Sequence, residues 1–151
     1  MFRHRELGNI ARAHGIWGEE VAVECLRRSG YEIIERNVRP VKRDQRLEID
    51  IIAYDRKADT MVFVEVKQHN RHSQWERRLR SIDKRKRILL RRACNVWRWK
   101  NAYHGDFRFD VIEVYGTPEG GRPEVDHIAK VNLFVDDGRF VNWDAEEEDA
   151  R

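Results

Sequence analysis

Charged side chains interrupt two short segments that otherwise have the composition of buried strands. In LEIDIIAY, side chains alternate between the two faces of a strand, which places Glu48 and Asp50 on one face. In MVFVEVK, the same alternation places Glu65 and Lys67 on one face, about 7 Å apart along the strand. The pattern therefore predicts three carboxylates and one ammonium group on two consecutive strands.

A hairpin would bring these groups together. If residues 56–59 form its loop, opposed residues have numbers that sum to 115, so Asp50 lies across from Glu65 and Glu48 across from Lys67. Opposed Cβ atoms are about 5 Å apart in an antiparallel pair. Like charges at that distance disfavour double ionisation, so we expect the pKa of Asp50 or Glu65 to be raised.

The chemistry that suits this arrangement is the binding of a divalent cation. Mg²⁺ takes oxygen ligands, usually one or two carboxylates, and completes its shell with water and substrate phosphate; Mn²⁺ suits similar donors. A neighbouring lysine can position the attacking water. The alternative is an exposed sheet face on which the acids and the lysine pair across the strands. Apolar neighbours on the same face, Ile52, Met61 and Phe63, favour the metal site.

The opening helical segment adds another acidic candidate, Glu19. It precedes Ala22, Val23 and Leu26 at helical spacing and so lies at the margin of a buried stripe. Glu19 is therefore a candidate metal ligand. The alternative is an acid in the first half of a helix that complements the helix dipole.

Hydrophobic periodicity and turn residues indicate the elements that must position these groups. The order is helix, three strands as a meander, helix and strand, which predicts an α/β layer with helices covering a mixed sheet. The expected elements are a helix from Leu7 to Arg28 ended by Gly30, strands Tyr31–Val38, Leu47–Tyr54 and Met61–Lys67, a loop from Asn70 to Arg80, a helix capped by Ser81 or Asp83 and running to about Tyr103, a strand Phe107–Tyr115 and an edge strand within Val125–Phe134.

Length and composition limit the class of protein. With 151 residues, the chain predicts one domain over residues 1–135, followed by an acidic, disordered tail at 136–151. No apolar run is long enough to span a bilayer or to act as a signal peptide, so we expect a cytoplasmic protein without membrane contact. The two cysteines, Cys25 and Cys94, are expected to be reduced thiols.

Positive charge is concentrated in one part of the chain. Residues 71–100 contain twelve Lys and Arg against two acids, a net charge of +10. On the second predicted helix, Lys84, Arg87, Arg91 and Arg98 share one face and are candidates for sequence-independent contacts with a phosphate backbone. The alternatives are a solvated face or a scaffold that meets an acidic partner.

Aromatic and histidine residues give weaker indications. Trp75 and Trp99 are candidates for stacking on unpaired bases, whereas Trp97 falls on an apolar stripe and is expected in the core. His69 and His72 have a spacing compatible with metal binding, but no further ligand follows nearby.

The succession of Asp50 and Glu65-Val66-Lys67 resembles the D…E-x-K signature of the PD-(D/E)XK, or restriction-endonuclease-like, nuclease superfamily. Further motifs accompany it in a fixed order: Gly18-Glu19, Gly30-Tyr31 through Arg36-Asn37, Glu48-Ile49-Asp50, Val62 to Lys67, and Arg108-Phe109-Asp110-Val111. This ordered set resembles the YraN-like family of mainly bacterial proteins over about residues 8 to 134.

The resemblance implies an αβββαβ nuclease core, similar to archaeal Holliday-junction resolvases. It implies that Glu19, Asp50 and Glu65 hold a divalent metal and that Asp50, Glu65 and Lys67 are catalytic. Two departures affect neighbouring residues. Gln68-His69 stands where the family tends to have Thr-Arg, and a basic stretch at 71–80 replaces a Gly- and Pro-containing turn.

The leading functional hypothesis is a Mg²⁺- or Mn²⁺-dependent endonuclease that acts on branched or partly single-stranded DNA. The alternative is a non-catalytic nucleic-acid-binding module with the same fold. Glu48, Gln68 and Asp110 are secondary site candidates, Asp110 as a residue that positions an arginine or supports the site from behind. The choice between monomer and homodimer stays open.

Overall fold

The structure, a computed structural model, describes residues 2–71, 84–136 and 139–140. Two helices and five strands make up its main body, and two further strands form a small hairpin. In chain order the elements are α1 (Phe2–Arg28), β1 (Tyr31–Val38), β2 (Ile49–Asp55), β3 (Thr60–His69), α2 (Lys84–Lys100), β4 (Asp106–Tyr115), β5 (Glu124–Ile128), β6 (Val135–Asp136) and β7 (Arg139–Phe140).

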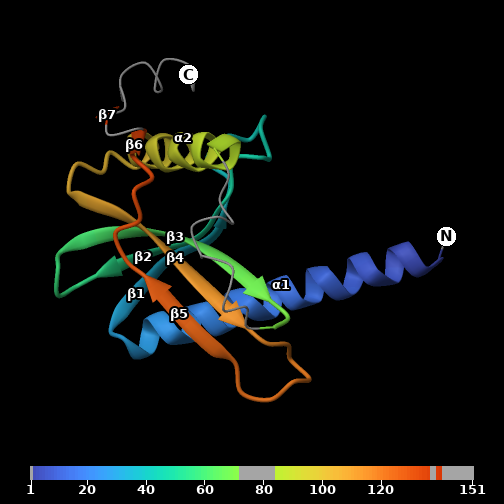
Figure 1. The fold of residues 1–151 in the computed structure, drawn as a ribbon. Helices are drawn as coiled ribbons and strands as arrows, with labels where there is room; N and C mark the ends of the chain where they lie inside the picture. Colours follow the sequence, from blue (N-terminus) through green and yellow to red (C-terminus); the bar gives the residue numbers. More distant parts are fainter. Residues whose placement is uncertain (1, 72–83, 137–138, 141–151) are drawn as a thin grey trace.

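The main sheet is mixed and has the strand order β1-β2-β3-β4-β5. The first three strands form an antiparallel meander, β4 pairs parallel to β3, and β5 pairs antiparallel to β4 at the edge. Helix α1 covers one face of the sheet and α2 covers the other (Figure 1). The expected α/β class and the αβββαβ order are therefore confirmed.

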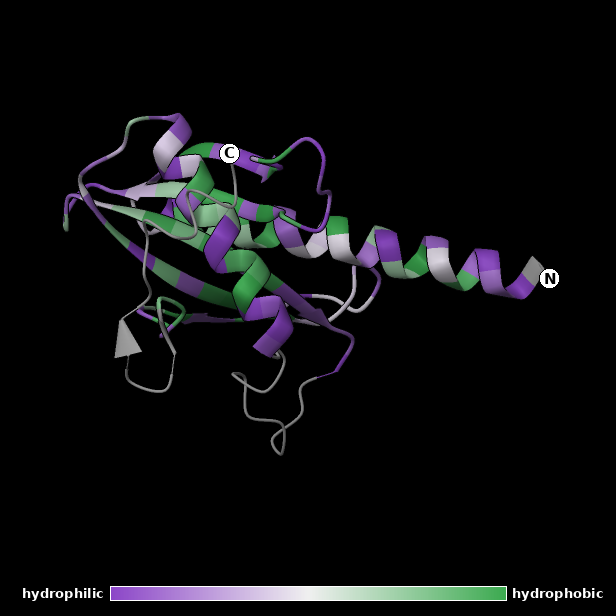
Figure 2. Cartoon of the chain, turned by 90° about the horizontal axis from the view of Figure 1, so that it is seen from above, coloured by the Kyte–Doolittle hydropathy of each residue, from purple (hydrophilic) through white to green (hydrophobic). Residues whose placement is uncertain are grey.

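Two hydrophobic clusters, one on each face, hold the helices to the sheet. Figure 2 shows the hydrophobic residues concentrated in the strands and in the parts of the helices that lie against them. On the α1 face, Ala22, Val23 and Leu26 pack with Ile51, Ala53, Val62, Val64, Ile112 and Val114. On the α2 face, Leu90, Ala93 and Trp97 pack with Ile49, Ile52, Phe63, Phe109 and Val111.

Most element boundaries agree with the sequence pattern. β1 has the expected bounds, and Gly30, with a φ of +88°, follows the end of α1. Helix α1 begins at Phe2 instead of near Leu7, and α2 ends at Lys100 instead of near Tyr103. The two expected caps of α2 and most of the basic 71–80 stretch lie outside the described residues, as does the tail from residue 141 onward.

The regular alternation of faces breaks where β1 ends and β2 begins. Ile51 packs on the α1 face, but Ile49 packs on the α2 face, although alternation predicts the same face for both. The partner strand changes its direction at the same level, because Asn37 has a φ of +50° just before Val38, which pairs with Ile49. Asp50 lies at this step, and the expectation that Ile49 shares a face with Ile51 and Ala53 by simple alternation is wrong.

Two further findings concern membrane-spanning helices and the cysteines. In the part of the chain that the structure describes, no helix has both the length and the apolar character required to cross a bilayer. Both cysteines are free thiols, with Cys94 buried and Cys25 half-buried.

Close packing at Gly18 sets the distance between α1 and β3. A Cβ atom at Gly18 would lie 2.9 Å from Cβ of Gln68, whereas a Cβ atom at Gly8 would have no neighbour within 4 Å. We predict that Gly18→Ala lowers the free energy of unfolding by about 1–3 kcal/mol, because the helix must move off the sheet. Gly8→Ala should raise it by about 0.5–1 kcal/mol through helix propensity. Urea unfolding measures both; equal effects would contradict this role of Gly18.

Candidate functional site

The carboxylate of Asp50 takes the place of a backbone hydrogen-bond acceptor between β2 and β3. The ladder between these strands begins with the pair Ile51–Val64 and follows the expected register. One residue further out, Oδ2 of Asp50 accepts the backbone N–H of Val66 at 2.8 Å. The carboxylate therefore occupies a position where a strand carbonyl would otherwise accept this hydrogen bond, and it is held next to β3.

Glu65 is buried beside Asp50 and between two lysines. Its side chain is 4% exposed, and its Oε1 lies 3.5 Å from Nζ of Lys67 and 3.4 Å from Nζ of Lys86. Burial, followed by the negative charge of Glu65, raises the pKa of Asp50 to about 8. The expectation that one carboxyl of this pair has a raised pKa is confirmed.

Glu19 and Glu48 bring two more carboxylates to the same region. Burial, and then the charge of Glu48, raises the pKa of Glu19, while Arg36 and a hydrogen bond with Asn37 act in the opposite direction. Glu19 also interacts electrostatically with Asp50. The structure thus brings the four predicted carboxylates into electrostatic contact at one end of β2.

A groove of about 870 Å³ opens beside Glu19 and Glu48, between α1 and the adjoining ends of β1 and β2. Three arginines line it: Arg12 from α1, and Arg36 and Arg39 from the end of β1. Arg36 lies 2.6 Å from a carboxylate oxygen of Glu20 and Arg39 lies 3.4 Å from one of Glu48. Sequence spacing could not bring Arg12 to the other two arginines, because only the fold places α1 beside the end of β1.

The donor atoms present suit a hard divalent cation. Among the described residues, no group of three His, Cys, Asp or Glu side chains is arranged to hold a metal ion. Mg²⁺, however, usually takes only one or two protein carboxylates and fills its shell with water and phosphate oxygens. Two adjacent carboxylates, half-buried Asp50 and buried Glu65, meet that requirement, and their mutual repulsion favours a cation between them.

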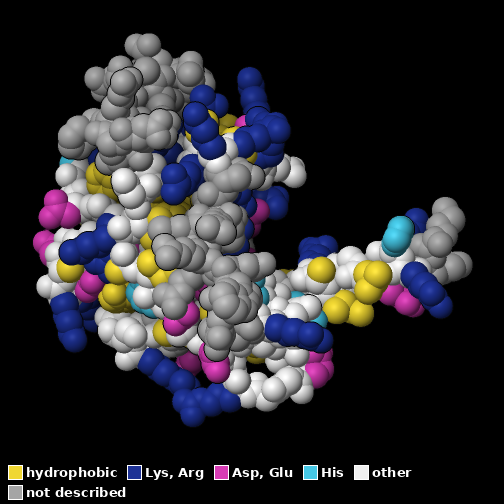
Figure 3. All heavy atoms as spheres, in the orientation of Figure 1, with side chains coloured by type: hydrophobic (Ala, Val, Ile, Leu, Met, Phe, Trp, Pro, Cys, Tyr) yellow, Lys and Arg dark blue, Asp and Glu magenta, His cyan; other side chains and the backbone are white. Residues whose placement is uncertain are grey.

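The predicted basic face of α2 divides into exposed and packed parts. Lys84 is exposed and Arg87 and Arg91 are half-buried. The guanidinium of Arg98 lies 3.7 Å from the ring centre of Phe107 and thus belongs to the packing at the far end of the helix. Lysine and arginine side chains gather over α2 on the surface (Figure 3). The α2 residue that contacts the site is Lys86, which sequence spacing did not indicate.

The structure gives the partners of two secondary candidates, Glu48 and Gln68. Glu48 precedes β2 and forms an ion pair with Arg39, so its expected place opposite Lys67 is wrong. The cause is the step at Asp50, which ends the regular pairing of β2 with β3. Gln68 donates hydrogen bonds to Oδ1 of Asn70 at 3.0 Å and to the carbonyl of Gly116 at 2.7 Å. Its amide therefore ties together the ends of β3 and β4.

Asp110 belongs to a separate buried network on the α1 face. It accepts hydrogen bonds from Nε of Arg108 at 3.0 Å and from the backbone N–H of Lys130 at 3.0 Å, and it contacts Nε2 of His127 at 2.7 Å. Arg108 in turn bonds to Asp55 at 3.0 Å. Asp110 therefore positions an arginine, which is one of its two expected roles. Its hydrogen-bond partners do not belong to the cluster around Asp50.

Three of the tryptophans and histidines with predicted roles lie within the described residues. Trp97 is in the core, as expected, and it donates a hydrogen bond to Glu35 at 3.0 Å. Trp99 is 43% exposed. Trp75 and His72 lie outside the described residues. His69 stacks on Tyr115 with ring centres 5.1 Å apart.

The raised pKa of Asp50 predicts a dependence of stability on pH. In metal-free buffer, folded Asp50 keeps its proton up to about pH 8, whereas the unfolded carboxyl has the ordinary value of 3.8. Rising pH therefore removes stability across this window, by at most about 1.4 kcal/mol per pH unit for one proton. Asp50→Asn cannot ionise, so the variant should gain stability relative to wild type from pH 5 to pH 8.

Urea unfolding at each pH, with a chelator present, measures this difference. Glu24→Gln, which removes an exposed carboxylate from α1, is the matched control and should show no such trend. A constant difference between Asp50→Asn and wild type across the window would contradict the proposed proton on Asp50.

Comparisons with known proteins identify the relatives of the chain. A model of the Uncharacterised protein family UPF0102 matches residues 18–114, which is more than half of the chain and includes the four carboxylates and Lys67. A UPF0102 protein of Acetivibrio thermocellus is 38% identical over 83% of this chain and 94% of the relative. One of Pelobacter propionicus is 36% identical over 82% of this chain and 83% of the relative. The chain therefore belongs to the UPF0102 family.

Proposed function

We propose that the protein is a Mg²⁺- or Mn²⁺-dependent endonuclease that hydrolyses phosphodiester bonds of DNA, with branched or partly single-stranded DNA as the preferred substrate. The observation that carries this proposal is the close pair of half-buried Asp50 and buried Glu65, with Lys67 beside it. A placement in the restriction-endonuclease-like superfamily is part of the same proposal.

The carboxylates and the lysine of the site have different parts in the proposed reaction. Asp50, oriented by the N–H of Val66, and Glu65 would hold the cation, and Glu19 would contribute from α1. When bound, the cation supplies stabilisation of the charge that develops on the phosphate. Lys67, whose Nζ lies 3.5 Å from Glu65, is placed to hold the attacking water or a phosphate oxygen.

The charges around the site favour a polyanionic substrate. The groove beside Glu19 is lined by Arg12, Arg36 and Arg39, and α2 presents further cations near Lys86. Several separated cations suit a chain of phosphates better than a single phosphate group. A cytoplasmic location agrees with this substrate and with the free thiols of Cys25 and Cys94.

Cleavage depends on Lys67 if the proposal is correct. We expect purified protein with Mg²⁺ or Mn²⁺ to nick branched or single-stranded-containing DNA and to leave a 5′-phosphate. Lys67→Ala should lower the rate by at least about two orders of magnitude and change binding little, because Lys67 acts on the transition state. Lys57→Ala, in the exposed β2–β3 turn, is the matched control and should cut at the wild-type rate.

The assay should cover supercoiled, branched, flap and single-stranded DNA, and end-labelling identifies the phosphate. One observation favours the alternative function, a non-catalytic binding module: Lys67 and Lys86 already compensate the charge of Glu65 without a cation. Wild-type protein that binds branched DNA but cuts none of these substrates would establish that alternative and refute catalysis.

Helix α2 should contribute contacts that do not depend on sequence. We predict that replacing Arg87 and Arg91 by Ala weakens binding to duplexes of any sequence equally. The slope of log affinity against log salt should decrease by about 0.9 for each phosphate that the variant no longer neutralises. Replacement of Arg46 and Arg56, which pair with Asp44 and Glu32, removes the same charge and serves as the control. Equal slopes for the two double variants would contradict a role of α2.

A further inference from the structure

The amino-terminal half of α1 projects beyond the sheet (Figure 1). Every residue from 3 to 13 is exposed, whereas the same helix is buried against the sheet at Ala22, Val23 and Leu26. We call residues 3–15 the arm. An isolated helix of this length is marginal in water. The arm therefore has little stabilisation from the rest of the described chain.

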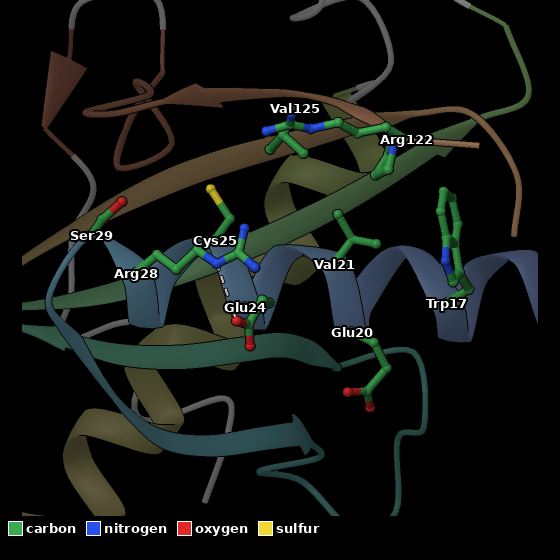
Figure 4. A pocket seen from close by; sticks show the side chains of 10 residues that line it. Trp17, Glu20, Val21, Glu24, Cys25, Arg28, Ser29, Arg122 and Val125 are labelled. Carbon is green, nitrogen blue, oxygen red and sulfur yellow. Dashed lines mark hydrogen bonds and ion pairs between the residues drawn. The ribbon is translucent and has the colours of Figure 1, made fainter. Parts of the chain in front are cut away.

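The arm has two different faces. Leu7 and Ile10, 62% and 51% exposed, continue the apolar stripe of Trp17 and Val21. That stripe lines a second groove of about 830 Å³ between α1 and the segment leading into β5 (Figure 4). Arg5, Arg12 and Glu19 lie on another face, because residues seven apart are two helical turns apart.

The face with Glu19 leads directly into the candidate site. Arg12, Gly15, Ile16 and Glu19 all line the groove that holds Glu48. At 1.5 Å per residue, Arg12 lies about 10 Å and Arg5 about 21 Å from Glu19 along the helix axis. Gly15 has no heavy atom within 4 Å of its Cβ position, so a ligand can approach the helix backbone there.

The arginines on this face of the arm differ in their pairing from six arginines of the body. Those six, which each form an ion pair with an acid, are Arg28, Arg36, Arg39, Arg46, Arg56 and Arg108. Within the described residues, no acid forms an ion pair with Arg5 or Arg12. These two guanidinium groups are therefore available to a ligand, and guanidinium binds phosphate with a bidentate geometry.

We propose that the arm is a nucleic-acid-binding element in which Arg5 and Arg12 contact phosphates of the substrate strand beyond the cleavage position. The proposal rests on the proposed function, because the arm extends the groove of the same site. A length of about 21 Å corresponds to about six nucleotides at 3.4 Å per step. The arm thus specifies a substrate with a continuous strand leading away from the site.

The test compares two double variants that remove the same charge from the same helix. Arg5→Ala/Arg12→Ala removes the proposed contacts, and Arg3→Ala/Arg27→Ala is the control, with Arg3 on the side of Leu7 and Arg27 at the opposite end of α1. Binding to branched and single-stranded DNA is measured by fluorescence anisotropy with a chelator present. The salt slope of the first variant should fall by about 1.8 on duplex DNA of the branched substrate and by about 1.4 on single-stranded DNA, and that of the control should stay close to wild type.

Hydrogen exchange gives an independent measurement on wild-type protein. Amides of residues 3–13 should exchange rapidly in the free protein and become protected when DNA is bound. Equal salt slopes for the two variants, or no protection of the arm in the complex, would overturn the proposal. Protection in the free protein that increases with protein concentration would assign the arm to a homodimer contact and would also overturn it.

Cleavage separates this proposal from the proposed function. Arg5→Ala/Arg12→Ala should raise KM and leave kcat unchanged in the presence of Mn²⁺. If wild type cuts DNA and the arm variant binds and cuts like wild type, the arm proposal is wrong and the nuclease proposal stands. If wild type cuts nothing but arm-dependent binding is observed, the nuclease proposal is wrong and the arm proposal stands.

Discussion

The hydrogen bond from the N–H of Val66 to Asp50 is the interaction on which the site depends. It places a carboxylate between two strands where their backbone pairing ends, and it brings that carboxylate against buried Glu65. Neighbouring like charges in a poorly solvated place must be compensated by a proton or a cation. Lys67 and Lys86 lie beside Glu65 and compensate part of its charge, while burial, followed by the charge of Glu65, still raises the pKa of Asp50.

The same sheet contains a second group of buried charges with the opposite balance. Asp110 is fully buried, but Arg108, His127 and the N–H of Lys130 all reach it. These hydrogen bonds outweigh the effect of burial and hold the pKa of Asp110 below its usual range. Burial of a carboxylate therefore does not by itself favour a ligand site. The shortage of donors around half-buried Asp50 favours the proposed cation site, because a cation can supply what the protein does not.

The sequence predicted those features that depend on local pattern. The hairpin register followed from alternation and loop length, so the proximity of Asp50, Glu65 and Lys67 could be inferred without a structure. Alternation could not show the step at Asp50, which lies near Asn37 and its positive φ, or the ion pair of Glu48 with Arg39. The groove arginines and Lys86 were also beyond sequence reasoning, because their places depend on how the helices pack on the sheet.

The contact of Gly18 with Gln68 marks the point where α1 changes from an exposed helix to a packed one. Gln68 is bonded in turn to the carbonyl of Gly116 at the end of β4, and Ala22, Val23 and Leu26 are buried against the sheet. The packed half of the helix therefore cannot move without opening the core. Bending of the exposed half moves Arg5, about 20 Å from Gly18, much further than Glu19, about 1.5 Å from Gly18. The tip of α1 can thus change its position while the backbone of Glu19 stays nearly fixed beside the other carboxylates.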